Sequence, residues 1–98
     1  KLLEFSSTRT IGTNTKETFT FEINVRNKKK TAISLLLEDQ LPLSTDKDIV
    51  VEALELSGGF VEAASGKVSW KLNLKPAESV KIKFSYSVRY PRDKQINL

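Results

Sequence analysis

The last third of the chain carries two runs in which apolar and polar residues alternate strictly. The first run extends from Val68 to Leu74 and the second from Val80 to Tyr90, with the turn sequence Pro76-Ala77-Glu78-Ser79 between them. Alternation with a period of two places every apolar side chain on one face of a strand. Two such strands joined by a short turn predict an antiparallel pair with one buried face. We expect Trp70 to be the central core residue, with its indole N–H bonded to an acceptor.

Further strand signals precede this pair, and no segment shows a clear helical period. The segments with strand signals are Leu2 to Ile11, Thr15 to Arg26, Ala32 to Leu41 and Ile49 to Leu56. The first alternates irregularly, which is typical of an edge strand or a strand with a bulge. Phe60 and Val61 fall in a short connection. We therefore predict an all-β fold, namely a single immunoglobulin-like or fibronectin-III-like antiparallel β-sandwich of about six to seven strands over residues 1–98.

The composition removes most catalytic chemistry. The 98 residues include no cysteine and no histidine. Disulfides, zinc-thiolate sites and thiol nucleophiles are therefore excluded, and the commonest general base and metal ligand is missing. The nucleophile-elbow pattern G-x-S-x-G is also absent. We expect no enzyme, no catalytic residue and no cofactor.

The charge of the chain is positive but dispersed. The net charge is +4, and the only basic run, Lys28-Lys29-Lys30, falls where a turn is expected. The aromatic residues alternate in phase with the aliphatic ones, so they belong to the core and not to a nucleic-acid stacking surface. No apolar stretch approaches the ~20 residues of a membrane helix. We expect a protein partner, no nucleic acid and no direct membrane insertion.

Three aspartates, Asp39, Asp46 and Asp48, form a weak candidate calcium site. Carboxylate oxygens suit calcium, and two of these residues fall in the loop that follows the third strand segment. Lys47 lies between those two aspartates, and the spacing matches no known metal loop. The alternative is that the aspartates accept local hydrogen bonds from turn N–H groups.

The sequence Tyr90-Pro91-Arg92-Asp93-Lys94 combines an aromatic ring, a rigid proline and alternating charges. Tyr90, Arg92, Asp93 and Lys94 are our weak candidates for a partner-binding edge, and Tyr90 could stack on a sugar. The alternative is a simple strand end, where Pro91 stops ladder pairing and the charged residues are solvated.

Several short motifs resemble one family along nearly the whole chain. They are Ile11-Gly12-Thr13-Asn14, Lys16-Glu17-Thr18, Val25-Arg26-Asn27, Leu37-Glu38-Asp39-Gln40-Leu41-Pro42, Trp70-Lys71-Leu72, Leu74-Lys75-Pro76-Ala77-Glu78 and Val88-Arg89-Tyr90-Pro91-Arg92-Asp93-Lys94. Together they resemble the DUF4139 family, which includes proteins described as mucoidy inhibitor A. The resemblance implies a multidomain, often exported bacterial protein with an N-terminal domain, a coiled coil and a terminal β module. It transfers no catalytic residue.

These observations lead to two functional hypotheses of different classes. The chain begins at Lys1 in mid-pattern, so we expect a piece of a longer protein. The resemblance implies that this piece is the C-terminal module of a periplasmic or envelope-associated protein. The first hypothesis is a non-catalytic structural or protein-interaction module, whose partners include upstream domains of the same chain. The alternative is a carbohydrate- or calcium-binding accessory domain serving an enzyme elsewhere in the full chain. An independent hydrolase ranks last, for want of a base and a pocket.

Overall fold

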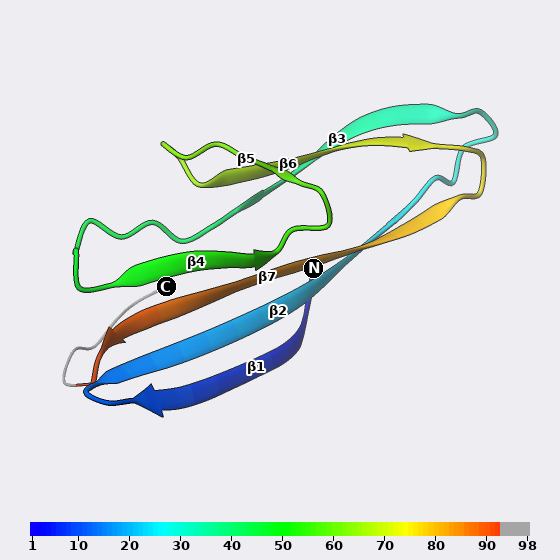
Figure 1. Ribbon diagram of the computed structural model, residues 1–98. Coiled ribbons are helices and arrows are strands. Elements are labelled where there is room, and N and C mark those ends of the chain that lie inside the picture. Colours follow the sequence, from blue (N-terminus) through cyan, green and yellow to red (C-terminus); the bar gives the residue numbers. More distant parts are fainter. Residues whose placement is uncertain (93–98) are drawn as a thin grey trace.

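The computed structural model describes residues 1–92, which form seven β-strands in two antiparallel sheets and no helix (Figure 1). The strands are β1 (Leu2–Ile11), β2 (Asn14–Arg26), β3 (Ile33–Gln40), β4 (Val50–Glu55), β5 (Phe60–Val61), β6 (Lys67–Leu74) and β7 (Ser79–Pro91). The predicted all-β sandwich is thus confirmed, and the short segment at Phe60 proves to be a strand. No helix in this part of the chain is long and apolar enough to cross a membrane.

Two long strands form the centre of the larger sheet. The four-stranded sheet has the order β1-β2-β7-β4, and the three-stranded sheet has the order β3-β6-β5. β2 and β7 pair over all 13 residues, from Asn14 opposite Pro91 to Arg26 opposite Ser79. β7 is also paired with β4 on its other side, as expected for so long a strand. This ribbon gives the molecule its elongated shape, with a longest dimension of 54 Å.

The predicted pairing of the last two strands with each other is wrong. β6 pairs with β3 and β5, whereas β7 pairs with β2 and β4 (Figure 1). The turn between them carries the chain from one sheet to the other, with Ala77 in the left-handed region at a φ of 64°. Strands that face each other across a core alternate just as strands of one hairpin do. The alternation therefore identified the buried faces correctly and the partners incorrectly.

Asn27 joins the two segments where the chain crosses between the sheets. Its side chain is 1% exposed, and its Nδ2 donates to the carbonyls of Thr31, Leu74 and Lys75 at 2.9 to 3.1 Å. Its backbone N–H donates to Glu78 O, and its carbonyl accepts from Ala77 N. The polar groups of both crossing loops therefore satisfy one another, as buried backbone requires.

The core lies between the sheets and is centred on Trp70 and Phe84. Its buried members are Ile23, Leu41, Val68, Trp70, Ile82, Phe84, Tyr86 and Val88. Trp70 is 4% exposed, and its Nε1 donates to Leu56 O at 2.6 Å. Both the core position of Trp70 and the acceptor for its indole N–H are as expected from the sequence.

Candidate interaction surface

β1 forms one edge of the four-stranded sheet and is exposed at every residue (Figure 1). Within residues 1–92 it pairs only with β2, and the register shifts between Leu3 and Phe5. The irregular alternation favoured an edge strand or a strand with a bulge, and β1 has both features. Leu2, Leu3, Phe5 and Ile11 are between 44% and 64% exposed. A strand of this length offers a partner both apolar side chains and a row of backbone hydrogen-bonding groups.

The register sorts the apolar side chains of β1 between the two faces of the sheet. Leu3 lies opposite Phe21, on the face that carries the core. Leu2, Phe5 and Ile11 lie opposite Glu22, Thr20 and Asn14, on the outer face. Partners directly opposite in an antiparallel pair share one face. Most of the exposed apolar surface of β1 therefore lies on the side away from the second sheet.

Lys1, just before β1, connects this strand to the second sheet. Its Nζ lies 3.1 Å from Asp39 Oδ1 on β3 and 4.4 Å from the centroid of the Phe21 ring. The ammonium is thus held by a carboxylate and by the face of an aromatic ring. This ion pair is partly exposed, so its contribution to stability is small.

The structure places the three candidate aspartates in separate local roles. Asp39 accepts hydrogen bonds from Lys1 and from the N–H of Gln40. Asp46 lies in the following loop, where its Oδ1 accepts from Asp48 N at 2.9 Å and its carbonyl accepts from Ile49 N. Within residues 1–92 no group of three or more acidic side chains is placed to hold a metal ion. The turn hydrogen bonds weighed as the alternative are present.

Tyr90 and Arg92 lie in different environments. Tyr90 is half-buried on the core-facing side of β7 and packs against the core. Burial raises the pKa of its phenol, and the neighbouring Glu17 carboxylate adds to the rise through a hydrogen bond and its charge. Sugar stacking by this ring stays a prediction.

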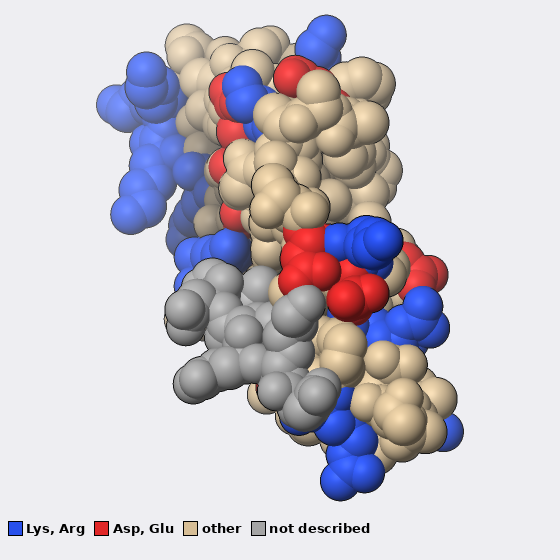
Figure 2. Space-filling model, turned by 90° about the vertical axis from the view of Figure 1, so that its left-hand side faces the viewer, with Lys and Arg blue, Asp and Glu red and all other residues tan. Residues whose placement is uncertain are grey.

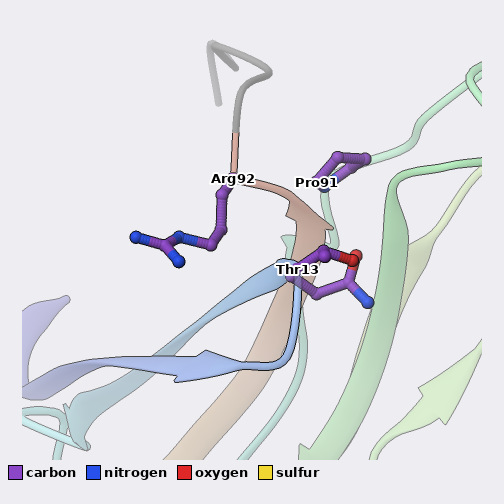
Figure 3. A pocket seen from close by; sticks show the side chains of 4 residues that line it. Thr13, Pro91 and Arg92 are labelled. Atoms are coloured by element: carbon purple, nitrogen blue, oxygen red, sulfur yellow. The ribbon is translucent and has the colours of Figure 1, made fainter.

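Arg92 belongs to the end of the molecule where the β1–β2 turn meets the end of β7. Its N–H donates to Thr13 O at 2.9 Å. Thr13, Asn14, Pro91 and Arg92 line a shallow hollow there, and the guanidinium of Arg92 points away from Pro91 (Figure 3). Asp93 and Lys94, the remaining candidates, lie outside the described residues. Partner binding by this cluster stays a prediction.

Charged side chains of both signs cover the surface. Figure 2 shows Lys and Arg along one side and at the lower end of the view, and acidic side chains beside further basic ones across the middle. Lys67 pairs with Glu38 at 3.0 Å and Lys81 with Glu22 at 2.8 Å. The hydrogen bond and charge of each glutamate raise the pKa of its lysine.

Three basic side chains form a row across the four-stranded sheet that the sequence did not predict. Arg9 on β1 lies opposite Lys16 on β2, and Lys16 lies opposite Arg89 on β7, all on the outer face of the sheet. In the sequence these residues are simply polar positions in three alternating runs. Only the register of the three strands brings them side by side.

The fold and this surface define an all-β sandwich module with an edge strand exposed along its whole length. The chain belongs to the DUF4139 family, a domain of unknown function whose sequence profile matches residues 2–92 and so covers nearly the whole chain. The family resemblance seen in the sequence motifs is thereby confirmed. Neither a comparison with curated proteins nor one with solved structures finds a match.

Proposed function

We propose that the chain is a non-catalytic protein-interaction module that binds an extended segment of polypeptide along the free edge of β1. The observation that carries this proposal is the exposure of all ten residues of β1. Half of the backbone N–H and C=O groups of an edge strand point away from its only neighbour and can pair with an added strand. Strand addition of this kind is a recurrent mode of peptide recognition.

The side chains of β1 suit such a partner. Leu2, Phe5 and Ile11 project from the outer face, and Ser7 and Arg9 lie between Phe5 and Ile11 on that face. An added strand that carries apolar side chains at alternate positions would cover Phe5 and Ile11 on that face. The main-chain bonds supply affinity, and the apolar positions supply selectivity.

The proposal also includes the protein to which this module belongs. The family resemblance supports an immunoglobulin-like module of a multidomain, envelope-associated bacterial protein. The added strand then comes from upstream domains of the same protein or from a second protein of the envelope.

A lysine substituted into the edge strand β1 tests this proposal. Phe5→Lys adds an edge lysine of the kind that discourages strand pairing. Leu36→Lys is the matched control, because Leu36 is 55% exposed and Phe5 is 56% exposed, and Leu36 also lies on an edge strand. The wild type and both variants are immobilised, and proteins captured from a cell-envelope extract are identified and purified. Hydrogen exchange of the β1 amides is then measured with each purified partner.

We expect a partner that the wild type and Leu36→Lys capture and Phe5→Lys does not, and that slows exchange along β1. Equal capture by all three proteins would contradict the proposal. A captured partner that leaves the exchange of β1 unchanged, or no partner at all, would contradict it as well.

A further inference from the structure

Arg9, Lys16 and Arg89 form a cross-strand row of like charges on the outer face of the four-stranded sheet. Each is the direct partner of the next across β1, β2 and β7. Neighbouring strands lie about 4.8 Å apart, so the three stems rise from the sheet at about that spacing. Like charges directly opposite one another are destabilising. Within residues 1–92 the salt bridges use Lys1, Lys67 and Lys81, so none of the three cations of the row forms a salt bridge with a described carboxylate.

The next row on the same face consists of hydroxyl residues. One of them, Ser87, has a hydroxyl that is reached from a surface hollow and makes no hydrogen bond with the described residues. Ser7 lies opposite Thr18, and Thr18 lies opposite Ser87. Ser87 is only 2% exposed, yet its hydroxyl makes no hydrogen bond with any described residue. Ser85, two positions earlier, bonds to both Thr20 Oγ1 and Phe19 O. The hydroxyl of Ser87 is therefore free to donate to a ligand.

Ser87 lines a hollow that the cations of β2 and β7 share. The lining residues are Ile11, Lys16, Val50, Glu52, Ser87 and Arg89, and the volume is about 100 Å³. The hollow is open to solvent and is large enough to admit a group of phosphate size. Lys16 and Arg89 outnumber Glu52, so the lining is net positive, and Arg9 adds a further positive charge beside it.

We propose that this hollow binds a tetrahedral oxyanion, a phosphate or sulfate group. Lys16 and Arg89 neutralise its charge, Arg9 contributes from the adjacent strand, and the hydroxyl of Ser87 donates a hydrogen bond. Glu52, opposite Ser87 on β4, repels an anion on that side and confines it to the part of the hollow over β2 and β7. Binding would relieve the repulsion between Lys16 and Arg89. This site is separate from the proposed strand addition at β1 and does not depend on it.

The experiment is a titration of the protein with inorganic phosphate, followed by the amide and side-chain NMR signals at constant ionic strength. Sulfate and chloride are titrated in parallel, and a sugar phosphate monoester separates free phosphate from a phosphate group carried by a larger molecule. We expect saturable shifts at Lys16, Ser87 and Arg89 with phosphate and sulfate, and none with chloride. Binding of the monoester assigns the site to carried phosphate groups, and its failure assigns the site to free anions.

Three variants test the assignment of residues. The double variant Lys16→Gln/Arg89→Gln should weaken phosphate binding at least tenfold, and Ser87→Ala should weaken it about threefold. Lys71→Gln is the control, because Lys71 lies opposite Leu36 on the other sheet. It should bind phosphate as the wild type does. Shifts that never saturate, or an equal loss in Lys71→Gln, would overturn the proposal.

Thermal unfolding supplies a second measurement that does not depend on NMR. Phosphate should raise the melting temperature of the wild type and of Lys71→Gln, but not that of the double variant. The double variant should fold, since it removes a repulsion and no core contact. If phosphate stabilises the double variant as much as the wild type, the site lies elsewhere and the assignment fails. Phe5→Lys should bind phosphate normally, which keeps this result independent of the β1 edge.

Discussion

The rings of Trp70 and Phe84 meet edge to face, with centroids 5.9 Å apart, in the core between the two sheets. Trp70 belongs to β6 and Phe84 to β7, so this contact joins strands that share no backbone ladder. Edge-to-face geometry adds to the stabilisation that burial of the two rings provides. The contact is thus one of the main links between the sheets.

Replacement of Trp70 should destabilise the fold in proportion to the atoms removed. We expect Trp70→Ala to lower the free energy of unfolding by ~3 to 5 kcal/mol. Trp70→Phe should cost about 1 to 3 kcal/mol, because it loses the bond to Leu56 O and part of the ring. Urea denaturation followed by circular dichroism measures both. Phe60→Ala, at a side chain that is 72% exposed, should change stability by less than ~0.5 kcal/mol. A loss at Phe60 as large as that at Trp70 would refute the assignment of the core.

A methyl group at Gly59 should disturb Trp70. A Cβ there would lie 2.6 Å from Trp70 Nε1 and 2.9 Å from Val68 Cγ1. We expect Gly59→Ala to cost about 1 to 3 kcal/mol and to shift the indole N–H signal in the NMR spectrum. Gly58→Ala is the control, because a Cβ at that position meets open space although its φ is 76°. It should strain the turn without moving the indole signal. An unchanged indole signal in Gly59→Ala would show that the turn does not pack against Trp70.

Asn27 should be among the most sensitive polar residues. Asn27→Ala removes the two N–H donors of Nδ2, which the carbonyls of Leu74, Lys75 and Thr31 share in a largely buried site. We expect a loss of about 2 to 4 kcal/mol. Asn73→Ala removes an exposed bond to Ser34 and should cost less than ~0.5 kcal/mol. Chemical denaturation of the two variants under identical conditions makes the comparison, and similar losses would contradict the role of Asn27.

The free energy of unfolding should fall in alkaline solution because the phenol of Tyr86 ionises. Burial raises the pKa of this phenol above its ordinary value of 10.0, and the charge of Asp39 raises it further. The folded state therefore favours the neutral phenol. Its contribution is complete below about pH 10, where the unfolded phenol ionises, and is lost as the pH rises through the folded pKa. Denaturation midpoints measured from neutral to alkaline pH should decline less in Tyr86→Phe.

Asp39→Asn provides a matched test of the cause. It should lower the pKa of Tyr86 and leave the pKa of Tyr90 unchanged, since Glu17 and burial act on Tyr90. Ultraviolet titration of the phenols in the folded protein reports both. A parallel change at the two tyrosines would rule out the specific influence of Asp39.

The strands could be predicted well from the sequence because alternation reflects only which face of a strand is buried. Each strand shows this pattern whatever its pairing partner is. In the segment Thr15 to Arg26, the alternating residues Phe19, Phe21 and Ile23 all face the core, and Leu36 in the next segment faces solvent. Partner choice could not be predicted in the same way. Alternation gives the buried face of Val80 to Tyr90 but does not distinguish a hairpin partner from a strand of the opposite sheet.

The surface features depend on register, which explains why they were missed. The row of Arg9, Lys16 and Arg89 combines positions up to 80 residues apart in sequence (89 − 9 = 80). Asn27 directly precedes the three lysines of the expected turn, and nothing in its sequence neighbours indicates burial. By contrast, the irregular alternation of Leu2 to Ile11 correctly predicted an edge or a bulge, because that feature is local.

The position of β7 has a consequence for the order in which the molecule can be built. β7 is the last of the seven strands along the chain, yet it occupies the interior of the four-stranded sheet, between β2 and β4. Its pairing with β2 joins residues that are between 53 positions (Arg26 and Ser79, 79 − 26 = 53) and 77 positions (Asn14 and Pro91, 91 − 14 = 77) apart in the sequence. During synthesis β1 and β2 can form a hairpin early, but β4 has no neighbour in its sheet until β7 has left the ribosome. The four-stranded sheet therefore cannot be completed until β7 has been synthesised, and folding should be slow for a domain of this size, with the aromatic face of β2 uncovered until β7 arrives.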